Sequence, residues 1–313
     1  MVAFLKKYNP ISVSIYLLLR LLKKIRGFHE NYRIYAPNFT SKRDLLLWRL
    51  SVLNPLINYD VNFRKKIFSE VPIDVFIPVS IKDIHHLTQV INGINKFVKH
   101  PINKIFVAAN PEQSILNICN SLKLSFIDEK TVLGYDKTMI KYIVNGIDRS
   151  GWLFQQLLKL GADKVVEMDN LLVIDADTIF IKPKVFFHNR KVILDHSTER
   201  HMPYHITYKK ILHHETTSLL SFITHYMMFN KEFLNNLKTK IEIIHKKSWD
   251  QAILENVDYN DESGFSEYEL YGNYLLNSEK TKIKREYCFN ATSFHDANNS
   301  FTKTVSIHSY AQI

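Results

Sequence analysis

Two aspartates that follow an apolar run carry the strongest chemical signal in the chain. Residues 171–174 are Leu, Leu, Val and Ile, and they lead directly into Asp175-Ala-Asp177. Spacing by two residues in an extended chain predicts that both carboxylates point to the same side. Two hard oxygen ligands placed in this way can hold Mg²⁺ or Mn²⁺ against the pyrophosphate of a substrate. The same triplet also occurs in structural turns, which is the competing explanation for Asp175 and Asp177.

Basic and amide side chains lie shortly before this pair. Arg149 precedes residues 151–160, which have the apolar spacing of a helix and include Gln156 and Lys159. Arginine suits phosphate because its planar guanidinium donates two parallel hydrogen bonds. We therefore expect Arg149 to reach a diphosphate, although a solvated cation at a helix start explains the same residue.

The elements that must position these side chains alternate between strand and helix from residue 71 onward. A short β-branched run at residues 73–79, stopped by a turn, is typical of a buried parallel strand. After it the sequence predicts helices at residues 86–100, 113–122 and 151–160, and strands at residues 104–109, 125–127, 165–168, 171–174 and 192–194. This alternation predicts an α/β fold, with a mostly parallel sheet and helices on both faces. Ligands bind such sheets outside the carboxyl ends of the strands, which is where Asp175 and Asp177 fall.

Residues 1–70 are expected to form a helical extension of the main domain, with helices at residues 11–25 and 43–53. The apolar stretch at residues 11–22 is shorter than the roughly 20 residues that a membrane-spanning helix needs. Lysines and arginines flank it, as in helices that lie on anionic lipid headgroups. A core-packing helix with a basic end fits the same pattern, whereas a signal peptide is disfavoured because no small-residue cleavage site follows.

Composition limits the classes of protein that remain. The 313 residues are 46% hydrophobic and 23% charged, which indicates a folded globular protein. Two distant cysteines, Cys119 and Cys288, exclude a disulfide framework and a cysteine zinc site, and they favour a reducing cytosol. The net charge of +10 predicts an acidic partner, and without a zinc-finger or RRM signature that partner is expected to be a phosphorylated small molecule or an anionic membrane surface, not nucleic acid. Dinucleotide, P-loop and serine-hydrolase motifs are also missing from the sequence, which argues against those three enzyme classes.

From residue 71 to residue 313 the chain resembles the glycosyltransferases of the GT-A fold. The resemblance rests on the opening strand, on the helix that contains Lys159, on the apolar strand into Asp-x-Asp, and on the segments 222–230 and 249–254. It implies that residues 71–313 form a catalytic domain that binds a nucleoside-diphosphate sugar. In that family the end of the first strand, here Pro78 and Val79, cups the nucleotide base, and the acidic pair holds a divalent metal ion on the donor diphosphate.

The resemblance also implies roles for residues nearer the C-terminus. Residues 265–272 are similar to the position where inverting members keep their catalytic base, and a related Ser-Glu-Tyr-Glu segment occurs in an uncharacterised bacterial family of this fold. Glu267 is therefore the first candidate for the base, Glu269 the second and Asp250 the third. An acidic side chain at a helix start is also favoured by the helix dipole, so a structural role for Glu267 is the alternative. His308 resembles a further metal ligand that many members supply, and a hydrogen-bonded core histidine is its alternative.

Contacts to the two substrates complete the expected site. Donor binding is assigned to Pro78, Val79, Arg149, Gln156, Lys159 and Asp175. Acceptor binding is assigned to His225 and to Arg200 and His201, which follow the strand at residues 192–194 and so fall at the ligand edge, although loop residues of this kind are often only surface.

Together these features predict a Mn²⁺- or Mg²⁺-dependent glycosyltransferase, inverting in outcome, that acts on a glycan or lipid-linked acceptor. A role in bacterial surface polysaccharide or lipopolysaccharide synthesis is implied by the resemblance, and a cytoplasmic position on the inner face of the membrane by the basic N-terminal segment. The alternatives are a metal-dependent nucleotidyltransferase or phosphohydrolase, which also use paired aspartates, and a non-catalytic membrane-associated glycan-binding protein.

Overall fold

The computed structural model describes residues 42, 45, 46, 48, 49, 68–278, 282–298 and 302–307. The described residues between 42 and 49 are helical, as expected for the helix at residues 43–53. The predictions of a helix at residues 11–25 and of a metal-binding His308 lie outside the described residues.

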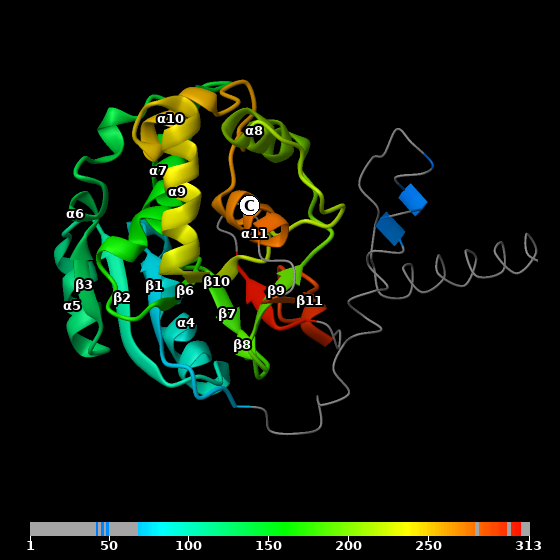
Figure 1. Cartoon of the computed structure of the whole chain (residues 1–313). Helices are drawn as coiled ribbons and strands as arrows, with labels where there is room; N and C mark the ends of the chain where they lie inside the picture. The colour runs from blue at the N-terminus through cyan, green and yellow to red at the C-terminus, as the bar shows by residue number, and fades with distance from the viewer. Residues whose placement is uncertain are drawn as a thin grey trace, which may run out of the picture.

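The fold is built on a five-stranded sheet with the strand order β10-β6-β1-β2-β3 (Figure 1). Its strands are β1 (Ile73–Pro78), β2 (Ile102–Ala109), β3 (Ser125–Asp128), β6 (Asn170–Ile174) and β10 (Tyr226–Asn230). Strand β1 pairs in parallel with β2 and β6, β2 pairs in parallel with β3, and β10 runs antiparallel to β6. The prediction of an α/β fold with a mostly parallel sheet is therefore confirmed.

Helices cover both faces of this sheet, because successive side chains of a strand point to opposite sides. In β1, Phe76 belongs to one hydrophobic core, while Val75 and Ile77 belong to the other. The first core includes residues of α7 (Ser150–Gly161), α8 (Met202–Leu212), α9 (Lys231–His245), α10 (Trp249–Asn256) and α11 (Glu267–Ser278); the second includes residues of α4 (Ile84–Phe97) and α5 (Gln113–Ser121). Among the helices described, none has the length and apolar content needed to cross a bilayer.

Two smaller sheets lie beside β10 and receive strands from the C-terminal part of the chain. One has the order β11-β9-β8, with β8 (Phe187–His188), β9 (Lys191–His196) and β11 (Ile283–Tyr287). The other pairs β7 (Thr178–Phe180) antiparallel with β12 (Thr304–Ser306). The shorter elements are the 3-10 helices Ile81–Asp83, Lys137–Met139, Ala162–Lys164 and Asp296–Asn298, the helix α6 (Glu129–Leu133) and the hairpin β4 (Ile143–Val144) and β5 (Ile147–Asp148). Because β7 directly follows Asp177, the strand β12 is placed next to the acidic pair.

One predicted strand, residues 165–168, is wrong. Those residues have no strand pairing, because their backbone donors are used within the loop and by a buried carboxylate. The N–H groups of Val165 and Val166 donate to the carbonyl oxygen of Ala162, at 3.1 and 3.2 Å. The N–H groups of Glu167 and Met168 donate to Asp74 Oδ2, at 2.6 and 2.8 Å. Asp74 is a buried residue of β1, and these bonds give hydrogen-bond partners both to its carboxylate and to the backbone N–H groups of the loop.

Candidate functional site

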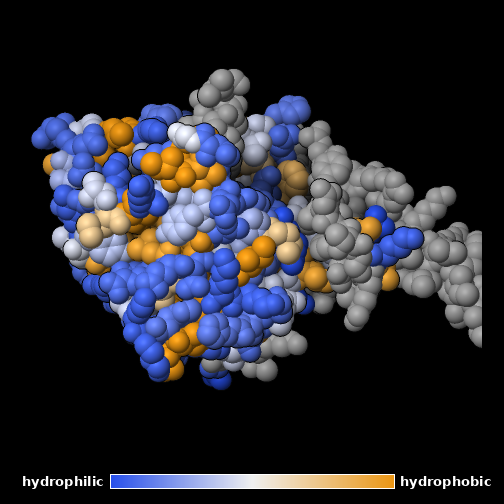
Figure 2. Space-filling model, turned by 90° about the horizontal axis from the view of Figure 1, so that it is seen from above, coloured by the Kyte–Doolittle hydropathy of each residue, from blue (hydrophilic) through white to orange (hydrophobic). Residues whose placement is uncertain are grey.

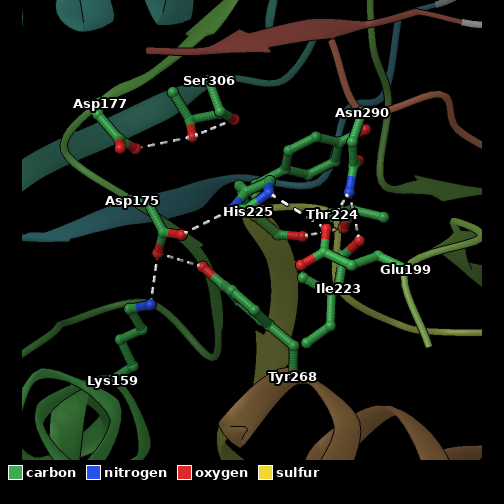
Figure 3. Close-up of polar contacts among 12 residues, drawn as sticks. Lys159, Asp175, Asp177, Glu199, Ile223, Thr224, His225, Tyr268, Asn290 and Ser306 are labelled. Atoms are coloured by element: carbon green, nitrogen blue, oxygen red, sulfur yellow. Dashed lines mark hydrogen bonds and ion pairs between the residues drawn. The ribbon is translucent and has the colours of Figure 1, made fainter. Parts of the chain in front are cut away.

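Asp175 and Asp177 lie in a tight turn at the carboxyl end of β6, between β6 and β7 (Figure 3). Thr178 N donates to the carbonyl oxygen of Asp175 at 3.1 Å, and Asp175 N donates to the carbonyl oxygen of His225 at 3.0 Å. The expectation that extended backbone aligns the two carboxylates is therefore wrong, since residues 175–178 form a turn. The turn lies at the same edge as the end of β1, because Phe76 is paired with Val173 of β6.

Three side chains, from α7, from α11 and from the segment before β10, surround the carboxylate of Asp175. Lys159 of α7 forms an ion pair with Oδ1, and the hydroxyl of Tyr268 donates to the same oxygen at 2.9 Å. His225 Nδ1 lies 3.2 Å from Oδ2 (Figure 3). Burial raises the pKa of Asp175, but the Lys159 charge and the His225 contact outweigh burial and leave the pKa below its usual value. Asp175 is therefore held ionised and in a fixed position.

Lys159 is the buried cation of the site. Lys159 is 3% exposed, and its ammonium group also forms an ion pair with Glu267 Oε1 at 2.7 Å. Burial would lower the pKa of Lys159, but the two carboxylates, Asp175 and Glu267, outweigh burial and raise it. The ammonium group also lies 4.6 Å from the centre of the Tyr268 ring. Lys159 thus joins α7, the acidic turn and α11 through charge.

The two candidate bases, Glu267 and Glu269, lie in the first turn of α11, and both are 0% exposed. Burial and the Asp175 charge raise the pKa of Glu267 against the opposing effect of Lys159. Among the described residues, no group donates a hydrogen bond to Glu267 Oε2, which is buried. As it stands, Glu267 faces Lys159 and has no open path to an acceptor sugar.

The carboxylate of Glu269 accepts hydrogen bonds from the segment that precedes His225. Its Oε1 accepts from Ser221 Oγ at 2.7 Å and from Phe222 N at 3.0 Å, and its Oε2 accepts from Asn273 Nδ2 at 2.8 Å. Burial raises the pKa of Glu269 to about 7, although these hydrogen bonds favour the ionised form.

Asp177 lies on the side of the turn that faces β12. Its Oδ1 is 3.3 Å from the Thr178 hydroxyl, which also contacts Ser306 Oγ at 2.8 Å, and its carbonyl oxygen accepts from Ile307 N at 2.9 Å (Figure 3). Burial and the charge of Asp177 both raise the pKa of Asp83, which places a third carboxyl group in this electrostatic neighbourhood. Within the described ranges, no group of three or more His, Cys, Asp or Glu side chains is arranged to hold a metal ion. A single carboxylate can suit Mg²⁺, which keeps water and substrate phosphate oxygens as its other ligands, so Asp177 fits such an ion. Both carboxylate oxygens of Asp175 already contact Lys159, Tyr268 or His225.

His225 lies opposite Lys159, on the other side of Asp175. It has a left-handed backbone with φ of 64°, a conformation that is uncommon outside glycine but is adopted more often by histidine, asparagine and aspartate than by other residues. Its Nε2 is 3.7 Å from Glu199 Oε2, and the same carboxylate oxygen accepts from Asn290 Nδ2 at 3.0 Å (Figure 3). Burial lowers the pKa of His225, but the contacts with Asp175 and Glu199 outweigh burial and raise it. His225 therefore connects the acidic turn to the loop that follows β9.

The other residues expected to bind the donor, Gln156, Arg149, Pro78 and Val79, have no hydrogen bond to Asp175 or Asp177 among the contacts of the described residues. Gln156 is buried, and its Nε2 donates to the carbonyl oxygen of Trp152 at 3.2 Å. Arg149 donates to the carbonyl oxygen of Glu262 at 2.7 Å and covers the Trp152 ring. Arg149 immediately precedes α7 and is ten residues before Lys159, which corresponds to about 15 Å along a helix. Pro78 is the last residue of β1, at the site's edge of the sheet, and the next residue, Val79, donates from its backbone N to the carbonyl oxygen of Ala108.

Two expected acceptor ligands and the third candidate base have structural contacts. Arg200 Nη1 donates to the carbonyl oxygen of Ser218 at 3.0 Å, and His201 Nε2 is 2.8 Å from Asp261 Oδ1. Asp250 lies in the first turn of α10 and near Tyr135, whose pKa is raised by burial and by that carboxylate. The structure therefore gathers Lys159, Asp175, Asp177, His225 and Glu267, and it places Asp250 beside Tyr135.

Sequence reasoning missed Tyr268, Glu199 and Asn290 as members of the site. Tyr268 lies between two candidate glutamates, and only the burial of the whole first turn of α11 brings it to Asp175. Glu199 belongs to the loop after the predicted strand at residues 192–194, which the strand-end rule placed at the ligand edge, but only its neighbours Arg200 and His201 were assigned a role. Asn290 had no signal, because its partners are contributed by distant segments.

None of the curated proteins matches this chain. Solved structures of similar shape include mouse xyloside xylosyltransferase 1 in its apo form, with 10% identity and a TM-score of 0.44 over 78% of this chain and 100% of that chain. They also include the galactosyltransferase LgtC in complex with donor and acceptor sugar analogues, with 12% identity and a TM-score of 0.41 over 75% of this chain and 86% of that chain. Identities this low leave the chemistry to be judged from the side chains of the site. By its sequence the chain belongs to a family of unknown function, DUF6492, whose family model matches residues 70–309.

Proposed function

We propose that this protein is a metal-dependent glycosyltransferase that moves a sugar from a nucleoside-diphosphate donor to a glycan or lipid-linked acceptor. The observation that carries the proposal is the turn with Asp175 and Asp177 at the carboxyl edge of a mostly parallel sheet, beside the buried cation of Lys159. Ligands bind such sheets at this edge, and paired carboxylates suit a cation that retains phosphate oxygens.

The donor diphosphate is proposed to lie against the turn on the side of Asp177. A Mn²⁺ or Mg²⁺ ion held by Asp177, with Asp175 and His308 as further ligands, would offset the negative charge that develops on the leaving diphosphate. Lys159 and Tyr268 bind Asp175 from behind and keep it from rotating. The protein thus presents a preformed acidic turn and does not need to order it when substrate binds.

Donor recognition is proposed to extend from this turn in two directions. Pro78 and Val79, at the end of β1, lie at the same edge of the sheet and would place the nucleotide base. Arg149 and Gln156 are proposed as the donor contacts contributed by α7, with Arg149 at the end of that helix farther from the turn.

Acceptor recognition is proposed for the loop after β9 and for the segment before β10. Arg200 and His201 come from the loop, and His225 comes from the segment. The assignment of the base to Glu267, then Glu269, then Asp250 stays a prediction, and it belongs to an inverting outcome. Because Glu267 and Glu269 are buried, either one would need a rearrangement of α11 to reach an acceptor hydroxyl.

The setting in bacterial surface polysaccharide or lipopolysaccharide synthesis, on the cytoplasmic side of the membrane, is part of the same proposal. On the face shown in Figure 2 the apolar residues form separate groups between hydrophilic ones, so that face offers no single large apolar patch. We therefore assign attachment to an anionic membrane surface to the basic residues that flank residues 11–22.

A binding and turnover screen tests the function. The wild-type protein is titrated with UDP-, GDP-, CMP- and dTDP-sugars, with and without Mn²⁺, and then assayed for sugar transfer and for nucleotide release. We expect Mn²⁺-dependent binding of one nucleotide class, lost in Asp177→Ala and kept in Glu255→Gln, a matched loss of an exposed carboxylate that pairs with Lys247. Nucleotide release without sugar transfer to any acceptor would favour a phosphohydrolase. Failure to bind any nucleotide would favour a glycan-binding protein.

A further inference from the structure

We infer that Glu199, in the loop after β9, takes the proton from the attacking hydroxyl during sugar transfer. The inference rests on the proposed function and deepens it, because it replaces an assignment to α11 with one to the open side of the site. The group that accepts this proton must touch an acceptor that arrives from solvent, so its exposure and its distance from the acidic turn decide the assignment.

Exposure separates Glu199 from the two buried candidates. The side chain of Glu199 is 49% exposed, whereas Glu267 and Glu269 are 0% exposed. Glu267 is paired with Lys159, and Glu269 accepts hydrogen bonds from backbone and side-chain donors. An acceptor can therefore reach Glu199 without any movement of α11.

Glu199 is also close to the acidic turn. Its Oε2 lies 3.7 Å from His225 Nε2, and the opposite ring nitrogen of His225 lies 3.2 Å from Asp175 Oδ2 (Figure 3). One imidazole ring thus separates the Glu199 carboxylate from Asp175. Glu199 lies at the outer end of this row, and Asp175 lies at the inner end against Lys159. A donor sugar bound next to the turn would have Glu199 on its acceptor side.

The position of Glu199 is fixed by contacts with two other segments. Ser197 and Ser221 exchange backbone hydrogen bonds at 2.9 and 3.1 Å, and Glu199 N donates to Ser197 Oγ at 3.2 Å. Asn290 Nδ2 donates to Glu199 Oε2 at 3.0 Å and to the carbonyl oxygen of Ile223 at 2.8 Å, so two acceptors fix the orientation of the amide. The described residues donate no hydrogen bond to Oε1 of Glu199. The carboxylate is therefore held by one oxygen and presents the other.

One bond forms, one bond breaks and one proton moves in the transfer step. The acceptor oxygen forms a bond to the anomeric carbon while the bond from that carbon to the phosphate oxygen breaks. The electron pair of the broken bond stays on the diphosphate, and the hydroxyl proton moves to Glu199. Water can replace the acceptor in the same step, which gives free sugar and nucleoside diphosphate.

The test compares four variants, Glu199→Gln, Glu199→Ala, Glu267→Gln and Glu255→Gln, with the nucleotide sugar that the wild-type protein binds. Donor binding is measured by titration with Mn²⁺. Turnover is measured as nucleoside diphosphate released in water and in the presence of p-nitrophenyl glycosides. We expect the Glu199 variants to bind the donor normally and to lose about 10² to 10⁴-fold in turnover. Added formate, a small carboxylate, should restore part of the turnover of Glu199→Ala but not of Glu199→Gln, whose side chain fills the space.

Each outcome bears on the inference directly. Glu255→Gln, which removes one exposed negative charge outside the site, should keep turnover per folded molecule. Near-wild-type turnover of Glu199→Gln would overturn the inference, and a loss confined to Glu267→Gln would return the role to Glu267. Weaker donor binding by Glu199→Gln with normal turnover would make Glu199 a binding residue and would also overturn it. A wild-type protein that binds no nucleotide sugar would instead refute the proposed function, and the inference with it.

Discussion

Replacing Lys159 by methionine should destabilise the protein by about 3 to 5 kcal/mol, the usual cost of leaving a buried charge without its partner. Lys159 is 3% exposed and pairs with Asp175 and with Glu267, which is 0% exposed. Methionine keeps much of the length and the apolar contacts of lysine, so most of the loss is electrostatic. A loss of this size is a large part of the roughly 5 to 15 kcal/mol that stabilises a typical folded protein.

The loss should depend on pH, and its sign follows from the carboxylates left behind. Without Lys159 the buried Glu267 has a folded-state pKa above its unfolded value, because burial disfavours its charge and the opposing cation is gone. The folded state then binds the proton more tightly, so the destabilisation is greatest above the folded-state pKa and shrinks as the pH falls toward the unfolded value. Lys159→Met should therefore be closer to wild-type stability at pH 5 than at pH 8.

Urea unfolding followed by tryptophan fluorescence measures these differences. Adding Glu267→Gln to Lys159→Met should recover about 1 kcal/mol or more, because it removes the unpaired charge. Lys247→Met is the matched control, since Lys247 pairs with Glu255 at the surface with side chains 45% and 55% exposed, and it should change stability by less than about 1 kcal/mol. The reasoning is refuted if Lys159→Met costs no more than Lys247→Met, or if its cost is the same at both pH values.

Three further predictions concern other parts of the chain. Glu269 has a folded-state pKa of about 7, above its unfolded value, so ionisation of this group lowers the free energy of unfolding of the wild-type protein as the pH rises from about 5 to 8. In urea unfolding, Glu269→Gln should reduce this pH-dependent loss by up to about 3 kcal/mol. A Cβ atom on Gly272 would lie 2.5 Å from Phe222 Cγ, so Gly272→Ala should lower the melting temperature at a cost of about 1 to 3 kcal/mol, whereas Gly151→Ala, whose Cβ would meet its nearest neighbour at 3.9 Å, should not. Deleting residues 1–30 should weaken sedimentation with vesicles that contain phosphatidylserine, and equal sedimentation of the two forms would count against the basic segment as the attachment site.

The sequence predicts the sheet well because its strands are short, buried apolar runs. Residues 73–79 and 171–174 could be recognised by composition alone, and the strand-end rule then placed Asp175 at the ligand edge. Residues 165–168 have a similar apolar character but form no strand. Two of their backbone donors go to Ala162, and the other two go to Asp74, a residue almost a hundred positions away. Local pattern cannot reveal a partner of that kind.

The site is predictable only in part for the same reason. The acidic pair can be recognised from its position directly after an apolar strand. The contact between Lys159 and Glu267 cannot be recognised in this way, because it joins residues 108 positions apart. Glu267 was singled out as an acid at a helix start, which gave no information on its burial or on its partner. Glu199 is positioned by contacts with Asn290 and His225, and the local spacing of residues predicts neither contact.

The late position of β12 in the chain affects the order in which the protein becomes complete during synthesis. Strand β7, which directly follows the acidic turn, pairs with β12 across the intervening residues 181–303. All strands of the central sheet have been made by residue 230, so that sheet can form while β7 still lacks its partner. At about 5 to 20 residues per second, a ribosome needs roughly 6 to 25 seconds to advance from β7 to β12. For that time the backbone of β7 is an unpaired edge, open to pairing with other chains or to protection by a chaperone.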